Sequence, residues 1–190
     1  MQKLAVFNHV ALDGYFVDAS NDMSWAKADQ NDSEWNAFVS ENASGGGTLV
    51  FGRITYELMA SFWPRPFAMK SMPDVAAGMN RMPKIVFSRT LDNASWQNST
   101  LLKGDLATEM RKLKQESETG IVILGSGSIV SQLAREGLID EYQVVVNPII
   151  LGKGRTMFGG LEDELPLKLT KSRAFKNGKV FLCYEPAIGN

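Results

Sequence analysis

Short segments with the character of β-strands recur along the first three quarters of this chain and alternate with stretches of helical character. The strand-like segments are Lys3–Val10, Thr48–Phe51, Lys84–Ser88, Ile121–Leu124 and Glu141–Val146. Each is too short for a helix and is followed by turn or capping residues, which is typical of buried strands. Strands that alternate with helices predict an α/β sheet with helices packed on both faces.

The last third of the chain has a different pattern. Leu167–Ala174 and Lys179–Tyr184 flank Asn177-Gly178, a residue pair that strongly indicates a tight β-hairpin. We therefore predict a mixed central sheet that ends in an antiparallel hairpin. The 190 residues, 44% of them hydrophobic and 22% charged, suit one domain over residues 1–190 rather than two.

Capping and turn residues predict where the helices lie. We expect helices to begin at Asn31 or Asp32, at Gly52-Arg53, at Pro73, at Asp105 and at Ser128. In the helix after Asp105, the spacing directs Leu106 and Met110 toward the core and leaves Lys114 in solvent. Val17–Gln30 is polar, has no clear period, and is expected to be a loop.

Composition excludes several classes of function. The formal net charge of −1 implies no basic face, so nucleic acid is not an expected partner. No apolar run approaches the ~20 residues that span a bilayer. Met1–Ala11 also lacks the features of a signal peptide, so we expect a cytoplasmic protein that does not bind membranes. His9 and Cys183 are the only residues of their types; we expect no metal site and a buried Cys183 thiol.

A glycine-rich turn follows the predicted strand Ile121–Leu124. Gly125-Ser126-Gly127-Ser128-Ile129 connects that strand to a helix, and the unpaired N–H groups at a helix start attract anions. Val130 stands where the dinucleotide fingerprint has its third glycine, and no Gly-Lys-Ser/Thr of a P-loop follows. Taken alone, the segment is either a phosphate-binding turn or an ordinary tight turn between a strand and a helix.

Two arginines follow other predicted strands. Arg53 lies directly after Thr48–Phe51, in Gly52-Arg53-Ile54-Thr55, and Arg89 follows Val86-Phe87-Ser88. Ligands of open α/β sheets collect beyond the carboxyl ends of strands, and arginine can donate two hydrogen bonds to a phosphate. Together these strand ends predict one anionic ligand with at least two phosphate groups. The alternative is three unrelated loops, with Arg53 on the surface and Thr55 as a helix cap.

The turn Leu12-Asp13-Gly14 follows the first predicted strand, and Tyr15-Phe16 comes next. Asp13 can simply stabilise this turn through its side chain. The alternative is that the loop closes over a planar ring held beside the first strand.

In this order, the segments resemble the dihydrofolate reductase-like superfamily. The closer match is the reductase domain of riboflavin biosynthesis, the C-terminal domain of bifunctional RibD proteins. The resemblance runs from about residue 3 to 185 and rests on Leu12-Asp13-Gly14, Gly52-Arg53-x-Thr55-Tyr56-Glu57, Pro83–Thr90, Leu124–Ser128, Gly137–Glu141 and Asn147–Gly154. It implies a dihydrofolate reductase-like three-layer fold with NADPH as the hydride donor.

The resemblance assigns roles to the strand ends. By it, Arg53 and Arg89 flank the adenosine 2′-phosphate, and Ser88 lies beside the adenosine. Thr55 and the Gly125–Ile129 turn hold the pyrophosphate.

The resemblance also implies that the backbone near His9 faces the nicotinamide, under a loop that contains Gly14 and Phe16. The complete set of cofactor-binding residues expected from it is His9, Gly14, Phe16, Gly52, Arg53, Thr55, Ser88, Arg89, Gly125, Ser126, Gly127, Ser128 and Ile129.

The sequence departs from these families at three points. Dihydrofolate reductases have a Gly-Gly pair with a cis peptide where this chain has Gly125-Ser126, which leaves the form of that bond open. Bifunctional RibD proteins carry a zinc deaminase, but His-x-Glu with Cys-x-x-Cys does not occur here, so we expect no deamination. No acid matches the one that dihydrofolate reductases place at the start of their first long helix. Asp32 and Asp13 are the candidate catalytic acids, with Asp29 and Glu34 near Asp32; each is alternatively a capping, turn or solvated carboxylate.

We therefore predict an NADPH-dependent oxidoreductase that resembles the riboflavin-pathway 5-amino-6-(5-phosphoribosylamino)uracil reductase and transfers hydride to a small heterocyclic or sugar-linked substrate. A pterin or dihydrofolate reductase is one alternative, and a non-catalytic nucleotide-binding protein on the same fold is another. The Leu151–Gly154 loop and the hairpin resemble family members that form dimers, so a homodimer is expected.

Overall fold

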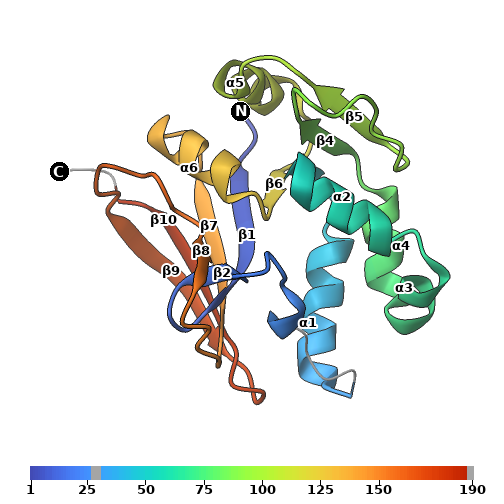
Figure 1. Cartoon of the computed structure of the whole chain (residues 1–190), viewed down its shortest axis with the longest axis vertical. Helices are drawn as coiled ribbons and strands as arrows, with labels where there is room; N and C mark the ends of the chain where they lie inside the picture. Colours follow the sequence, from blue (N-terminus) through green and yellow to red (C-terminus); the bar gives the residue numbers. More distant parts are fainter. Residues whose placement is uncertain (27–30, 188–190) are drawn as a thin grey trace.

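The computed structural model describes residues 1–26 and 31–187, and a mixed β-sheet forms its centre. The strands of this sheet are β1 (Leu4–Ala11), β3 (Thr48–Gly52), β4 (Lys84–Phe87), β5 (Ser99–Leu102), β6 (Ile121–Leu124), β7 (Glu141–Asn147), β9 (Leu167–Ala174) and β10 (Val180–Pro186). They lie in the order β5-β4-β3-β6-β1-β7-β10-β9. The first six strands in this order, from β5 at the edge to β7, pair in parallel. Strand β10 pairs antiparallel to β7, and β9 pairs antiparallel to β10 (Figure 1). The predicted mixed sheet with a C-terminal hairpin is confirmed.

Helices cover both faces of the sheet, as predicted (Figure 1). The described helices are the 3-10 turn η1 (Ser24–Ala26), α1 (Ser33–Ser44), α2 (Arg53–Phe62), α3 (Pro66–Ser71), α4 (Pro73–Arg81), α5 (Leu106–Glu116) and α6 (Gly127–Arg135). Met110 of α5 and Leu133 of α6 pack on one face against Val6 of β1. Helices α1, α2 and α4 pack on the other face, where Tyr56 and Met79 contact the core around β3 and β4.

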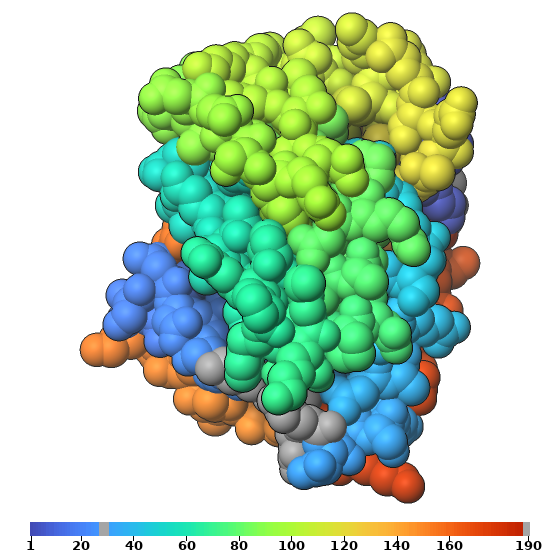
Figure 2. Space-filling model, turned by 90° about the vertical axis from the view of Figure 1, so that its right-hand side faces the viewer, coloured from blue at the N-terminus to red at the C-terminus, as the bar shows by residue number. Residues whose placement is uncertain are grey.

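A small second sheet lies outside the central one. Its strands, β2 (Tyr15–Asp18) and β8 (Gly154–Thr156), are antiparallel. Figure 2 shows the blue segment that contains β2 directly against the orange segment that contains β8. Our expectation of a loop over Val17–Gln30 is therefore wrong for Val17–Asp18 and for η1, while residues 27–30 lie outside the described residues. Strand β2 is stabilised by pairing with β8, which is remote in the sequence, so the residues around β2 do not by themselves indicate a strand.

The predicted helix caps are confirmed. The Asp32 carboxylate accepts the backbone N–H of Trp35 at 3.0 Å, and Asp105 accepts that of Thr108 at 2.9 Å. Helix α4 begins at Pro73, as expected, because proline suits the first turn of a helix.

The expectation that Lys114 is solvated is wrong. Its side chain is buried, donates to the carbonyl oxygen of Leu138 at 2.8 Å, and pairs with Asp140 at 2.5 Å. Asp140 also accepts the N–H of Leu4, so Lys114 connects α5 to the start of β1. The thiol of Cys183 is buried, as predicted.

Among the described residues, no helix has the length and apolar character needed to cross a bilayer. Within the same residues, histidine, cysteine and acidic side chains form no cluster able to hold a metal ion.

Candidate functional site

A pocket of about 480 Å³ lies at the carboxyl ends of β3, β4, β5 and β6. Strands β3 and β6 are neighbours, yet the helices that follow them, α2 and α6, pack on opposite faces of the sheet. Such a reversal opens a crevice at the sheet edge, which is where α/β proteins bind ligands. The size of this pocket is ordinary for a small-molecule site.

A second hollow, of about 880 Å³, lies over α4 and the 95–98 segment. Arg81 is the only charged side chain among the residues that line it, and the hollow contains no end of a parallel strand. Trp96 and Asn80 at its base bond to each other, Nε1 to Oδ1, at 2.7 Å. Despite its larger volume, this hollow has a single described cation, Arg81, whereas the strand-end pocket has four.

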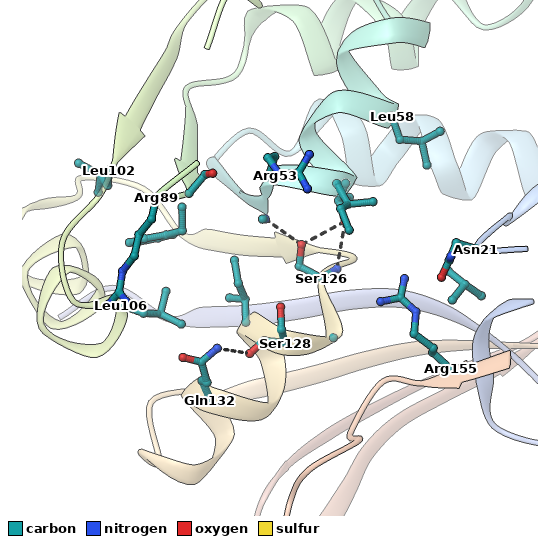
Figure 3. Close-up of a pocket in the computed structure, with 18 of the residues that line it drawn as sticks. Asn21, Arg53, Leu58, Arg89, Leu102, Leu106, Ser126, Ser128, Gln132 and Arg155 are labelled. Atoms are coloured by element: carbon teal, nitrogen blue, oxygen red, sulfur yellow. Dashed lines mark hydrogen bonds between the residues drawn. The ribbon is translucent and has the colours of Figure 1, made fainter. Parts of the chain in front are cut away.

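Positive charge is concentrated in the strand-end pocket. Among the described residues, Arg53, Arg89, Lys103 and Arg155 line it, against one acidic residue, Asp105. Figure 3 shows Arg89 and Arg155 at opposite ends of the pocket, with Ser126 and Ser128 between them. This excess occurs in a chain whose formal net charge is −1, so the positive charge is local to the pocket and would favour an anion there.

The one acid in the pocket is already engaged. Asp105 caps α5, where its carboxylate accepts the backbone N–H of Thr108 at 2.9 Å and the hydroxyl of Thr108 at 2.8 Å. These bonds hold the pKa of Asp105 below its ordinary value, and the charges of Arg111 and Arg89 add to the effect.

Ser126 connects the two phosphate-facing motifs predicted from sequence. Its Oγ accepts the N–H of Gly52 at 2.8 Å and lies 3.1 Å from Oγ1 of Thr55. Its own N–H donates to Oγ1 of Thr55 at 3.2 Å, and its φ of 56° is left-handed. The neighbouring N–H of Gly125 donates to Oδ1 of the buried Asn8 at 2.8 Å. The peptide bond between Gly125 and Ser126 is trans.

The amino end of α6 faces the pocket. Among the described residues, no side chain caps it, so its first N–H groups are available to a ligand. A Cβ added at Gly127 would lie 3.1 Å from the Phe16 ring and 3.2 Å from the carbonyl oxygen of Met157. Glycine therefore allows β2, β8 and α6 to meet at this point.

The pocket brings together most of the residues expected to bind a cofactor. Those that line it are Phe16, Gly52, Arg53, Thr55, Ser88, Arg89, Ser126, Gly127, Ser128 and Ile129. Gly125 lies one residue before the lining segment and is held by Asn8, whereas Gly14 and His9 do not line the pocket.

The side chain of His9 points away from this pocket. Neighbouring residues of a strand face opposite sides, and Asn8 reaches the pocket side whereas His9 lies against α1. The His9 ring packs edge-on against Trp35, with centroids 5.7 Å apart, and its Nδ1 lies 3.3 Å from Nδ2 of Asn147. Burial, aided by the positive charge of Lys179, lowers the pKa of His9 to about 4. The imidazole is therefore neutral at pH 7.

The candidate acids are engaged elsewhere as well. Asp32 caps α1 and also accepts Nδ2 of Asn177 at 2.7 Å. Asp13 accepts the N–H groups of Leu151 and Gly152, the latter at 2.7 Å. Neither carboxylate lines the pocket.

Of the two acids near Asp32, Glu34 pairs with Arg173 at 3.2 Å. Asp29 lies outside the described residues.

Sequence reasoning missed several residues that line the pocket. They are Val17, Asn21, Met23, Ile54, Leu58, Phe87, Leu102, Lys103, Gly104, Asp105, Leu106, Gln132 and Arg155. Recognising Ser99–Leu102 as a strand would have exposed Lys103-Gly104 as another strand end. Arg155 directly follows the Gly152-Lys153-Gly154 motif, and only the pairing of β8 with β2 directs it to the pocket.

Solved structures share this architecture over nearly the whole chain. A putative riboflavin biosynthesis protein from Shewanella sp. PV-4 has a TM-score of 0.75 and 24% identity, with 98% of this chain and 100% of that chain covered. A diaminohydroxyphosphoribosylaminopyrimidine deaminase/5-amino-6-(5-phosphoribosylamino)uracil reductase from Thermotoga maritima has a TM-score of 0.65 and 15% identity, with 98% of this chain but 57% of that chain covered. The fold is therefore that of RibD-like reductases, which is dihydrofolate reductase-like, as predicted.

Residues 2–181 match the RibD C-terminal domain, and the chain belongs to that family. Two relatives from Bacillus subtilis (strain 168) cover almost its full length. The uncharacterized protein YyaP is 25% identical over 93% of this chain and 90% of its own, and the uncharacterized protein YwjB is 26% identical over 92% of each. Membership of this family supports a reductase-like role.

Proposed function

We propose that this protein is an NADPH-dependent reductase that transfers hydride to a small heterocyclic or sugar-linked substrate related to 5-amino-6-(5-phosphoribosylamino)uracil. The observation that carries the proposal is the excess of positive charge in the strand-end pocket. Among the described residues, four cations and the uncapped start of α6 line it, whereas its one carboxylate, Asp105, is occupied in capping α5. NADPH has three phosphate groups, so its negative charge complements the excess of basic side chains in the pocket.

The pocket residues fit the parts of this cofactor. The N–H groups at the start of α6 suit a pyrophosphate, because no side chain of the described residues caps this end of the helix. Arg53 and Arg89 suit the 2′-phosphate, since each guanidinium can donate two hydrogen bonds. Thr55 lines the pocket, and its hydroxyl bonds to Ser126 and so supports the turn that we propose to hold the pyrophosphate.

When bound, NADPH supplies the hydride; the residues of this chain bind and orient it. Phe16 and Met23 provide apolar surface at the β2 side of the pocket, where exclusion of water would protect a reactive ring. The source of the proton stays a prediction. Asp32 and Asp13 are the candidate proton donors, and water that enters the open pocket is the alternative.

The dihydrofolate reductase alternative requires a carboxylate that faces the substrate ring. Asp32 has its two oxygens on Trp35 N–H and the Asn177 amide, which favours a capping role. We therefore prefer an aminouracil-like acceptor to a pterin. We further propose that residues 1–190 act as one domain, as a cytoplasmic homodimer.

Thermal unfolding tests the cofactor assignment. A ligand present at about 100 times its dissociation constant adds about 2.7 kcal/mol of stability. We expect a clear rise in Tm with NADPH and a smaller rise with NADH. Arg53→Ala and Arg89→Ala should each reduce the preference for NADPH roughly tenfold, because each removes a charge-assisted partner of the 2′-phosphate.

Arg111→Ala is the matched control. Arg111 pairs with Glu136 at 2.6 Å and does not line the pocket, so the variant should keep the preference of the native protein. Equal stabilisation by NADPH and NADH in the native protein would contradict the 2′-phosphate assignment. No stabilisation by either would contradict the reductase proposal. Consumption of NADPH with the aminouracil-ribose phosphate substrate then tests the acceptor.

A further inference from the structure

Arg155 is the one pocket arginine that no sequence motif predicted. We propose that Arg155, carried by β8, binds the pyrophosphate of the cofactor on its nicotinamide side and so fixes that half of the ligand beside α6. This inference rests on the proposed function, because it assigns a further residue to the same ligand.

The position of Arg155 is fixed by the small sheet. Arg155 is the register partner of Val17, and a Cβ at the preceding Gly154 would overlap the carbonyl oxygen of Val17. The guanidinium carbon lies 5.7 Å from the centroid of the Phe16 ring. That ring in turn contacts Gly127, so one aromatic ring separates Arg155 from the amino end of α6.

No side chain of the described residues neutralises the charge of Arg155. The side chain is exposed and forms no ion pair or hydrogen bond with any residue of the described ranges. By contrast, Arg53 pairs with Glu57 at 3.1 Å and Arg173 with Glu34 at 3.2 Å. A guanidinium that rests near an aromatic face keeps its donors free for a phosphate, which it can bind with two parallel hydrogen bonds.

The position along the pocket defines which phosphate Arg155 meets. Figure 3 shows Arg155 next to Asn21 at one end, with Arg89 and Leu106 at the other. The assignment of Arg89 to the 2′-phosphate makes its end the adenosine end. Arg155 then lies beyond the start of α6, on the side toward the nicotinamide. Removal of Arg155 should therefore weaken the binding of NADPH and of NADH alike and leave the preference between them unchanged.

Isothermal titration calorimetry with three ligands tests this assignment. NADPH and 2′-phospho-ADP-ribose both contain the pyrophosphate, whereas adenosine 2′,5′-bisphosphate retains only its adenosine-side phosphate. Arg155→Ala should lower the affinity for NADPH and for 2′-phospho-ADP-ribose by roughly tenfold or more, which is the usual effect of losing a charged hydrogen bond. Affinity for the bisphosphate should stay within about twofold. Arg155→Lys keeps the charge but not the planar fork, so its losses should be intermediate.

Two control variants sharpen the comparison. Lys153 is an exposed cation two residues away that does not line the pocket, so Lys153→Ala should leave all three affinities unchanged. Arg89→Ala should instead weaken the binding of all three ligands, the bisphosphate included, because each contains the 2′-phosphate. Circular dichroism checks that each variant is folded. Arg155 is exposed and has no hydrogen-bond or ion-pair partner among residues 1–26 and 31–187, so its removal should not unfold the protein.

Several outcomes would overturn the inference. Equal losses in Arg155→Ala and Lys153→Ala would indicate a general charge effect, and a loss for the bisphosphate would move Arg155 to the adenosine end. Unchanged NADPH affinity, with a raised KM for a phosphorylated acceptor, would assign Arg155 to the substrate instead. A native protein that binds none of the three ligands would overturn the proposed function as well, whereas native binding without an Arg155 effect overturns this inference alone.

Discussion

Ser126 joins two segments that lie 74 residues apart, because its hydroxyl accepts the N–H of Gly52. The sequence predicts that the Gly125–Ile129 turn holds the pyrophosphate, but it gives no direction for the Ser126 side chain. The hydroxyl of Ser126, whose backbone is left-handed, bonds to Gly52 and Thr55, and Gly127 and Ser128 after it line the pocket. The residue type was therefore informative about the place but not about the direction of the side chain.

His9 gives the molecule a pH-dependent stability. In the unfolded chain its pKa is about 6.5, whereas burial and Lys179 lower the folded value to about 4. Between these values the unfolded state binds more protons, so stability rises with pH and is lost as the pH falls below about 6.5. The charges near His9 are Lys179 and, beside Lys179, Asp32.

We expect acidification from pH 7 to about pH 4 to remove on the order of 3 kcal/mol through this group. His9→Phe keeps the edge contacts with Trp35 and Phe7 and removes the titration. Urea unfolding across this range should therefore give a shallower loss of stability in the variant than in the native protein. Parallel losses would show that His9 does not titrate differently in the folded state.

Secondary structure elements were predictable where their signals are local. Helix α4 and the starts of α1 and α5 follow from Pro73, Asp32 and Asp105, whose capping chemistry needs only neighbouring residues. Strands β5 and β8 were missed, since neither contains a buried residue and so neither has the apolar run that marks β4 and β6. Helix α3 was missed because a proline can mark either the end or the start of a helix, and Pro66 lies in the first turn of α3.

The same distinction applies to the candidate site. Arg53, Arg89 and the Gly125 turn follow strands that are recognisable in the sequence, and they reach the same edge of the sheet. Arg155 and Asn21 reach the pocket only through the pairing of β2 with β8, which their own neighbours in the chain do not encode.

The close approach of β8 to β2 requires a glycine at position 154. Gly154→Ala would place a Cβ on the carbonyl oxygen of Val17, so β2 and β8 must separate or shift. We expect faster amide exchange in Tyr15–Asp18, weaker NADPH binding, and a loss of roughly 1–3 kcal/mol in stability. Hydrogen exchange measured by mass spectrometry provides the first readout without any ligand.

Gly159→Ala is the matched control for this variant. A Cβ at Gly159 meets only ordinary contacts, 3.4 Å from the Thr156 hydroxyl, so exchange in Tyr15–Asp18 should match the native protein. If Gly154→Ala also left that exchange unchanged, the tight approach of β8 to β2 would be wrong.

At the scale of the whole molecule, charge is distributed unevenly. The formal net charge is −1, yet the pocket has four basic side chains and one acidic one. Ligand binding should therefore depend on salt more than folding does. Raising ionic strength from about 0.01 M to about 0.15 M shortens the screening length from ~30 Å to ~8 Å.

We expect this change to weaken NADPH binding roughly tenfold, while the Tm of the free protein changes little. Calorimetric titrations at the two ionic strengths measure the effect. The double variant Arg89→Ala, Arg155→Ala should show a smaller salt dependence. An NADPH affinity that is independent of salt would argue against electrostatic binding in this pocket.

The pairing of β2 with β8 also has a consequence for the order in which the protein is made. Tyr15 and Thr156 are register partners, so the two walls of the pocket leave the ribosome far apart in time. The segment after β1 must wait for more than a hundred further residues before its partner emerges. A nascent chain can therefore begin its sheet early, but it acquires a complete ligand site only after Gly154–Thr156 has been synthesised.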